Sequence, residues 1–456
     1  MRLFCSFLLA ALSLAAEPAD WIWSARYVLT GGGARRVIEN GAVAIRGERI
    51  VAVGTRAEID RRFQPKQRLD RPGALIAPGL INTHTHAAMT LFRGYGGDLP
   101  LMRWLREKIW PVEAKLEPED VYWGTRLACA EMIRTGTTRF WDMYWHPAES
   151  ARAARDAGLR ATIGGPLLDA EGNTRAMQES ALENLAALGE LGPEISPSLA
   201  PHSIYTVSEE LLRWTAELAA EREVAVQIHL SETKDEVREC LDQRGLRPAA
   251  YLDRLGLLGE RTALAHGVWL DRAELELIAA RGCTVVANPV ANMKLAVGGV
   301  LPYPAAREAG VRVGLGTDGP GSNDSLDLLA DLKVFALSQR HASGDPTVLP
   351  AREAWAVAIG ATAPLLTSEL HQISGPADRK FDAVRVGGAA DFLLLRPDSY
   401  ELGLGDLYSD LVYAASGSVV DTTVVGGRVL MRGGEVPGVE EIVARALERS
   451  KRLGMA

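Results

Sequence analysis

Residues 76–86, IAPGLINTHTH, are a short apolar run that ends in two histidines two positions apart. Side chains of a β-strand alternate between its two faces, so His84 and His86 point to the same side of such a strand. Two imidazoles on one strand face can bind one metal ion together. The same spacing also occurs in half-buried or surface pairs, so the interpretation depends on the rest of the chain.

Seven further β-like runs follow this one, separated by longer segments with helical spacing. They are 137–143 TTRFWDM, 160–168 RATIGGPLL, 194–201 EISPSLAP, 224–230 VAVQIHL, 262–267 TALAHG, 284–289 TVVANP and 311–318 VRVGLGTD. Segments 208–223 and 271–282 carry apolar residues three and four positions apart, as amphipathic helices do. Eight alternating units predict the α/β class and a (β/α)8 TIM barrel.

Polar residues gather where these runs end. The C-terminal ends of the strands form the rim that carries the active site in such barrels. Five of the eight histidines of the chain are at or next to such an end, and His341 and His371 lie in polar segments typical of a surface. The polar residues at strand ends are His84, His86, Asp142, Asp169, His202, His229, His266, Asn288 and Asp318.

Four of these side chains form a candidate metal site. His84 and His86 are joined by His229 and by Asp318, each at the end of another strand. Three imidazoles and a carboxylate suit Zn²⁺, with Fe²⁺ as the alternative. Two-metal barrels usually recruit a bridging carboxylated lysine, but the fourth run ends in residues 200–202, Ala-Pro-His. We therefore expect one divalent metal ion.

Three residues are candidates for proton transfer. A metal lowers the pKa of bound water toward about 7, but a leaving group still needs a proton. Glu232 follows His229 by three residues and can carry protons to a substrate nitrogen; an exposed loop or capping glutamate is the alternative. Asp318 can take the water proton, and His266 can hydrogen-bond the attacking oxygen. His266 and His202 can also be structural histidines.

These motifs resemble the amidohydrolase superfamily, and within it the 5′-methylthioadenosine/S-adenosylhomocysteine deaminase group, with its guanine deaminase and triazine hydrolase relatives. The resemblance covers most of the chain and depends chiefly on HTH at 84–86, HLSET at 229–233 and GTDG at 316–319. It implies that Glu113 binds ribose hydroxyls and that His202 contacts the purine. It also implies the roles given above: His84, His86, His229 and Asp318 for the metal, Glu232 for the proton and His266 beside it.

The chain departs from this group at three places. Residues 164–166, Gly-Gly-Pro, stand where deaminases of the group carry an arginine that can bind the homocysteine carboxylate. The second arginine of the group has no clear equivalent in this chain, and Arg175 is the one candidate for it. Ala287 replaces the familiar histidine before Asn288 and Pro289, which changes the pocket without touching the metal ligands. Binding of carboxylate-bearing substrates is therefore left open.

The two ends of the chain have a different pattern. Segments 21–33, 37–54 and 74–79, and later 382–399, 411–417 and 419–436, are short β-rich runs joined by glycine-rich or charged turns. We expect them to pair into one small β-sandwich. The predicted boundaries are 18–76 and 379–456 for this domain and 77–378 for the barrel, with a closing helix at 439–454.

Composition and charge exclude some partners. The net charge is −8, the pI is about 5.7, and no Lys/Arg-rich run occurs, so nucleic acid is not an expected partner. A small heterocyclic substrate is expected, and homo-oligomerisation is left open.

Residues 1–16 contain Arg2, an apolar run at 3–14 and small residues after it, as a signal peptide does. Export to the periplasm or medium is predicted, without stable membrane insertion after cleavage; a cytoplasmic location is the alternative.

Taken together, these features predict a metal-dependent hydrolytic deaminase that acts on an adenosine-like nucleoside and releases ammonia. A first alternative is an amidohydrolase for another heterocycle, such as a triazine, guanine or a cyclic amide. A second alternative is a binding protein that has kept the barrel without turnover. Such a protein could dispense with Glu232 and Asp318, and both are kept here.

Overall fold

The structure, a computed structural model, describes residues 16–31, 36–169, 172–363, 365, 383–396 and 399–455. Its larger sheet runs in the order β13-β12-β11-β10-β9-β7-β6-β5, with the short β8 (Pro166–Leu167) paired to β9. Every neighbouring pair on this path is parallel. The strands are β5 (Leu80–Thr85), β6 (Thr137–Met143), β7 (Arg160–Gly164), β9 (Ile195–Pro201), β10 (Ala225–Leu230), β11 (Thr262–His266), β12 (Thr284–Ala287) and β13 (Arg312–Leu315).

The last of these strands lies beside the first and closes the barrel. The Thr83 hydroxyl donates to Leu315 O at 2.8 Å, and Asp318 N donates to His84 O at 3.1 Å. Gly316 permits this approach, because a Cβ atom there would lie 2.8 Å from His84 O. All eight predicted strands are present, and the predicted (β/α)8 barrel is confirmed.

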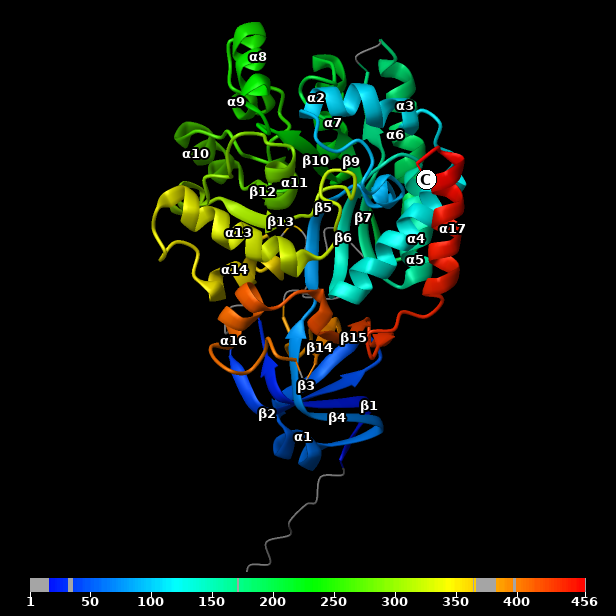
Figure 1. Cartoon of the computed structure of the whole chain (residues 1–456), viewed down its shortest axis with the longest axis vertical. Helices are drawn as coiled ribbons and strands as arrows, with labels where there is room; N and C mark the ends of the chain where they lie inside the picture. The colour runs from blue at the N-terminus through cyan, green and yellow to red at the C-terminus, as the bar shows by residue number, and fades with distance from the viewer. Residues whose placement is uncertain are drawn as a thin grey trace, which may run out of the picture.

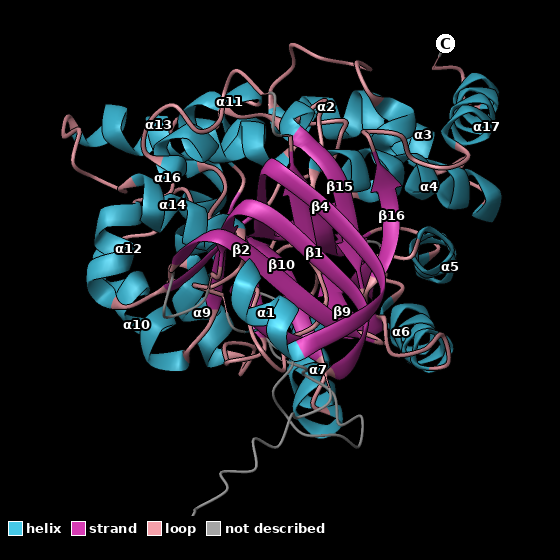
Figure 2. Cartoon of the chain, turned by 90° about the horizontal axis from the view of Figure 1, so that it is seen from below, coloured by secondary structure: helices cyan, strands magenta, loops and turns pink. Residues whose placement is uncertain are grey.

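Helices surround the barrel, as Figure 1 and Figure 2 show. The predicted helices at 208–223 and 271–282 are confirmed as α7 (Glu209–Arg222) and α10 (Arg272–Arg281). Between β6 and β14, the other helices with described bounds are α5 (Pro147–Ala157), α6 (Thr174–Gly189), α8 (Lys234–Arg244), α9 (Pro248–Arg254), α11 (Pro289–Lys294), α12 (Tyr303–Ala309), α13 (Leu328–Ser343) and α14 (Ala351–Ala358). Before β6 come η1 (Ala87–Phe92), α2 (Leu101–Trp104), η2 (Leu105–Ile109), α3 (Trp110–Glu113) and α4 (Pro118–Thr135).

The second sheet is built from both ends of the chain, as predicted. Its order is β16-β15-β14-β4-β1-β2-β3. The strands are β1 (Glu17–Leu29), β2 (Val37–Arg46), β3 (Arg49–Thr55), β4 (Phe63–Pro78), β14 (Phe392–Leu395), β15 (Val420–Val425) and β16 (Arg428–Arg432), with α1 (Arg56–Arg62) between β3 and β4. Ile50 N donates to Gly388 O at 3.0 Å and Ala390 N to Glu48 O at 2.8 Å, so the β3 side of the sheet bonds back to the segment before β14.

One predicted strand is wrong. Residues 411–417 were expected to be extended, but the chain forms α16 (Leu407–Ser409), η3 (Asp410–Ala414) and the 3-10 turn η4 (Gly417–Val419). The Asp406 side chain caps the start of this helical stretch by accepting from Ser409 N. Leu411 and Val412 are both fully buried, and a helical turn that packs on α13 and α14 can bury two adjacent side chains together.

A buried ion pair joins the two sheets. Arg160, the first residue of β7, donates from Nε to Asp391 Oδ2 at 2.8 Å, and Gly426 N donates to Asp391 Oδ1 at 2.6 Å. The side chains of Arg160 and Asp391 are 4% and 1% exposed. Pairing satisfies the charge of each, which would be costly to bury alone. The barrel is thereby fixed on the small sheet, which lies below it in Figure 1.

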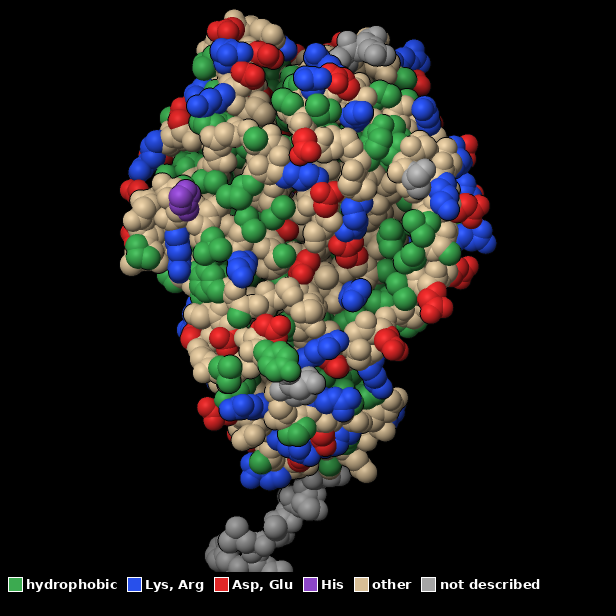
Figure 3. Space-filling view, viewed as in Figure 1, with side chains coloured by type: hydrophobic (Ala, Val, Ile, Leu, Met, Phe, Trp, Pro, Cys, Tyr) green, Lys and Arg blue, Asp and Glu red, His purple; other side chains and the backbone are tan. Residues whose placement is uncertain are grey.

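The predicted closing helix is confirmed as α17 (Val439–Arg452), which packs against α4 and η1. Among the described helices none is long and apolar enough to cross a membrane. Residues 1–15 lie outside the described residues, so the signal peptide and export stay predictions. His371 also lies outside the described residues, so its expected surface position stays a prediction. On the face in Figure 3, Lys and Arg side chains are interspersed with Asp and Glu.

Candidate metal centre and active site

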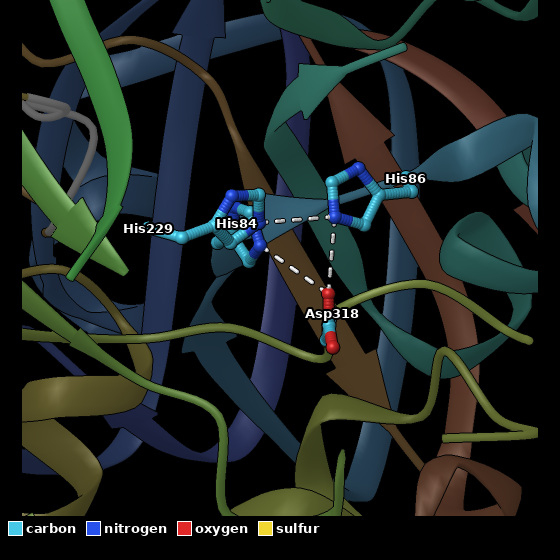
Figure 4. Close-up of side chains that lie close together, drawn as sticks. All are labelled: His84, His86, His229 and Asp318. Carbon is cyan, nitrogen blue, oxygen red and sulfur yellow. Dashed lines mark hydrogen bonds and ion pairs between the residues drawn. The ribbon is translucent and has the colours of Figure 1, made fainter. Parts of the chain in front are cut away.

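Four side chains converge at the rim of the barrel. His84 comes from β5, His86 follows directly after that strand, His229 comes from β10, and Asp318 comes from the loop after β13 (Figure 4). Asp318 Oδ1 lies 3.3 Å from His84 Nε2 and 3.2 Å from His86 Nε2, and His229 Nε2 lies 3.3 Å from His86 Nε2. One ligand atom from each residue lies within 4.8 Å of all the others. This spacing allows all four to bind one ion.

The other nitrogen of each imidazole is already bonded. His84 Nδ1 lies 2.9 Å from Gln227 Oε1, His86 Nδ1 2.6 Å from Met143 O, and His229 Nδ1 2.6 Å from His202 O. Each partner is an acceptor, so each Nδ1 carries the proton and donates it. The Nε2 atoms of all three rings are then left to face the centre of the cluster, as metal-binding histidines require.

The cluster fits a divalent cation. His84 Nε2 is buried and faces Asp318 Oδ1, and with the proton on Nδ1 these two atoms are both acceptors, which is costly unless a cation lies between them. Burial lowers the pKa of His84 and of His229, so these rings are neutral, the form that binds a metal. Burial also opposes protonation of His86, but the Asp318 carboxylate outweighs it and raises the pKa of His86 to about 9. Metal binding would release that proton.

Asp318 is held in place by a strained backbone and several bonds. Its φ is +62°, a left-handed conformation that is uncommon for non-glycine residues and recurs at functional sites. The Ser322 hydroxyl donates to Asp318 Oδ2 at 2.8 Å, and the Thr85 hydroxyl donates to Asp318 O at 2.9 Å. Burial would raise the pKa of Asp318, but His84 and His86 outweigh it and hold that pKa well below its usual range.

Glu232 and His266 lie beside this cluster. Both are buried, and Glu232 Oε1 is 3.9 Å from His266 Nδ1. His266 Nδ1 also lies 2.8 Å from Asn292 Oδ1, and His266 has a φ of +76°. Burial raises the pKa of Glu232 to about 8, and the Asp318 charge adds to the rise. Glu232 can therefore hold a proton at neutral pH and give it to a substrate.

The cluster borders a pocket of about 690 Å³, part of it open to solvent. Every predicted site residue except the fully buried His84 lines this pocket: His86, Glu113, His202, His229, Glu232, His266 and Asp318. Burial raises the pKa of Glu113, and the neighbouring Tyr144 and Trp145 oppose the rise. Burial lowers the pKa of His202 to about 3, so this ring is neutral.

One wall of the pocket is apolar. It comes from η1, α2, η2 and α3, the segment between β5 and α4, and sequence reasoning did not single it out. Its pocket-lining side chains are Met89, Leu101, Trp104, Leu105, Ile109 and Trp110. The π-helical turn η2 lies within it, and such turns are frequent at functional sites. An apolar wall of this kind would exclude water from one side of a ligand bound in the pocket.

Some rim residues have structural roles instead. Asp142 Oδ1 accepts from Ala87 N at 2.7 Å, directly after His86, and Asp169 accepts from Ser208 N at 2.6 Å. Neither lines the pocket. Gln227 was missed, although it lies two residues before His229 on β10, and the alternation of a strand places both side chains on one face.

Comparisons with known proteins agree with this geometry. The amidohydrolase family model matches residues 75–430. A 5′-deoxyadenosine deaminase of Methanoregula boonei is 45% identical over 410 residues, covering 89% of this chain and 90% of that protein. A 5-methylthioadenosine/S-adenosylhomocysteine deaminase of Syntrophobacter fumaroxidans is 41% identical over 442 residues, covering 95% and 98%. The crystal structure of an adenosine deaminase from Xanthomonas campestris with bound zinc is 34% identical, with a TM-score of 0.87 and coverage of 97% and 100%.

Proposed function

The chain belongs to the amidohydrolase family, and we propose that it is a metal-dependent deaminase of adenosine-like nucleosides that hydrolyses a non-peptide C–N bond and releases ammonia. The family resemblance expected from the motifs is confirmed. The observation that carries the proposal is a buried glutamate, Glu232, that holds a proton beside three imidazoles and a carboxylate converging on one point. Zn²⁺ is the proposed ion, because three nitrogen ligands and one oxygen ligand suit it.

The chain's own residues supply the proton transfers. When bound, the cation acts as a Lewis acid that lowers the pKa of water toward about 7. Glu232 donates its proton to a ring nitrogen of the substrate as water adds to the carbon that bears the amino group. Asp318 accepts one proton from the water and passes it to the amino group, which leaves as ammonia. The remaining hydroxyl proton returns to Glu232, so the product carries a C=O group and the carboxyl group is restored. His266 hydrogen-bonds the incoming oxygen and keeps it aimed at that carbon.

Glu113 is the proposed partner of the ribose. It lines the same pocket as Glu232 and the metal ligands, at the end of the apolar wall. A carboxylate can accept hydrogen bonds from two vicinal hydroxyls, and bonds to a charged group are the stronger ones. A nucleoside would thus present its sugar to Glu113 and its base to Glu232 and His202.

Glu113→Ala is expected to raise KM for nucleosides by about 10- to 100-fold, because bonds to charged groups contribute about 1.5–3 kcal/mol. The free base should bind as it does to the wild type. Steady-state kinetics with adenosine, and inhibition by adenine, measure the two effects. Glu107→Ala is the matched control, because Glu107 is an exposed glutamate of the neighbouring turn that pairs with Arg103. Equal weakening of nucleoside and base binding would refute the ribose assignment.

The pocket also indicates which 5′ substituents a nucleoside can carry. Among the described residues that line it, none is Lys or Arg, and its acidic side chains are Glu113, Glu232 and Asp318. A neighbouring chamber shares Trp110, Glu113, Trp145 and Leu168 with it and likewise has no described Lys or Arg. An anionic substituent would lose its hydration there and gain no cationic partner.

We therefore expect kcat/KM for 5′-deoxyadenosine and 5′-methylthioadenosine to exceed that for S-adenosylhomocysteine and adenosine 5′-monophosphate by at least about tenfold, which corresponds to about 1.4 kcal/mol. Parallel progress curves with the four compounds test this. Equal kcat/KM values across the series would show that a cation reaches the 5′ position and would contradict the specificity proposed here.

A further inference from the structure

A second buried glutamate lies directly behind Glu232. Glu236 is in the first turn of α8, on a helix whose neighbouring residues Lys234 and Asp235 are exposed, yet Glu236 itself is only 5% exposed. Its two carboxylate oxygens accept from two successive backbone amides. Ser231 N donates to Oε1 at 2.7 Å, and Glu232 N donates to Oε2 at 2.8 Å. The Glu236 side chain is thus hydrogen-bonded to the backbone of Glu232, the proposed proton donor, and to that of the residue before it.

This arrangement is more than a helix cap. In a capping box, the glutamate at the third helical position accepts from the backbone amide of the capping residue. The cap of α8 is Thr233, whose hydroxyl accepts from Glu236 N at 3.2 Å. Glu236 reaches past Thr233 to the two residues before it. Its contacts therefore serve the turn that carries Glu232 rather than the helix end alone.

The turn needs such support. Ser231 has a φ of +50°, the left-handed region in which a non-glycine residue is strained. Its carbonyl accepts from Trp269 N at 2.9 Å, in the loop that follows His266. The turn is therefore held by Glu236 on its amide side and by the His266 loop on its carbonyl side. Loss of the hydrogen bonds to Glu236, or of the one from Trp269 N, would let the turn relax and would move the Glu232 carboxyl group.

We propose that Glu236 is a positioning residue for the deamination, one that fixes the Glu232 turn by accepting both of its amides. This inference rests on the proposed function, because it assigns Glu236 to the reaction through Glu232. A carboxylate is needed, since an amide side chain has one acceptor oxygen and would set its NH2 group against the second backbone N–H. A shift of about 1 Å in a reacting group can cost about 100-fold in rate.

Glu236→Gln in the metal-replete full-length protein tests this, with Glu239→Gln as the control on an exposed residue of the same helix. We expect Glu236→Gln to lower kcat for the deaminated nucleoside by about 100-fold, with KM and metal content as in the wild type. Amide hydrogen exchange in the peptide that contains residues 231 and 232 should become faster. Glu239→Gln should change none of these quantities.

Several outcomes would overturn the proposal. They are a kcat equal to that of Glu239→Gln, unchanged exchange at residues 231 and 232, or a loss of metal in step with the loss of rate. If Glu236→Gln does not fold, Glu236→Asp keeps a carboxyl group but is one methylene short of both amides, and it should show the same fall in kcat. Failure of the wild type to deaminate any nucleoside would refute the proposed function instead, while the exchange measurement would still test the contact.

Discussion

Glu232→Gln is expected to lower kcat for ammonia release by about 1,000-fold, within the 10²- to 10⁴-fold range of general acid–base catalysis. Glutamine has nearly the same shape and polarity, so the pocket should keep its form, but it cannot donate a proton to a ring nitrogen. KM and metal content should therefore stay close to the wild-type values. Glu239→Gln serves again as the exposed control. An unchanged kcat would remove Glu232 from the mechanism.

The same residue sets a pH dependence. Burial raises the pKa of Glu232 to about 8 from an ordinary value of 4.5, so the protonated form persists through neutral pH. Because the donor must be protonated, kcat/KM should fall as the pH rises through about 8. The small activity left in Glu232→Gln should lack this fall. A profile with an identical alkaline limb in both proteins would assign the limb to another group.

Loss of a metal ligand is the second large effect. His229→Ala should remove tightly bound metal and, with it, all but a small fraction of the activity, because the ion activates the water. A chelator should do the same to the wild type, and added Zn²⁺ should restore only the wild type. His341→Ala is the matched control, because His341 is exposed on α13. Retention of one ion per chain and of full activity by His229→Ala would contradict the metal site.

Substitution of Gln227, which orients a metal ligand without binding the metal, should weaken metal binding only in part. Its Oε1 accepts from His84 Nδ1, and its Nε2 donates to Thr83 O at 2.9 Å, which fixes the orientation of the amide. Replacement by leucine should weaken metal affinity by about 10- to 100-fold, the usual effect of removing a group that orients a ligand. Metal titration by calorimetry would measure this intermediate affinity.

The sequence could predict the barrel and the metal cluster because both depend on local pattern. The alternation of strand side chains placed His84 and His86 on one face, and the rule that strand ends share a rim brought His229 and Asp318 to them. The same alternation would have identified Gln227. These predictions needed no knowledge of how distant segments pack.

The features that were missed depend on contacts between distant segments. The helical stretch at 410–414 has the β-like composition of a strand and is helical because it packs on α13 and α14. The apolar wall is formed by four short elements, η1, α2, η2 and α3, and no periodicity in the sequence fixes their directions. The direction of the Glu236 side chain, toward the turn rather than its own helix cap, is visible only in three dimensions.

The most direct test of the central claim is the stoichiometry of ammonia release by the purified, zinc-loaded protein with 5′-deoxyadenosine as substrate. The account predicts one ammonia for each nucleoside converted to its 6-oxo product, with the oxygen of that product coming from water. No ammonia from this or any other adenosine-like nucleoside, by a protein that holds its metal, would contradict the account.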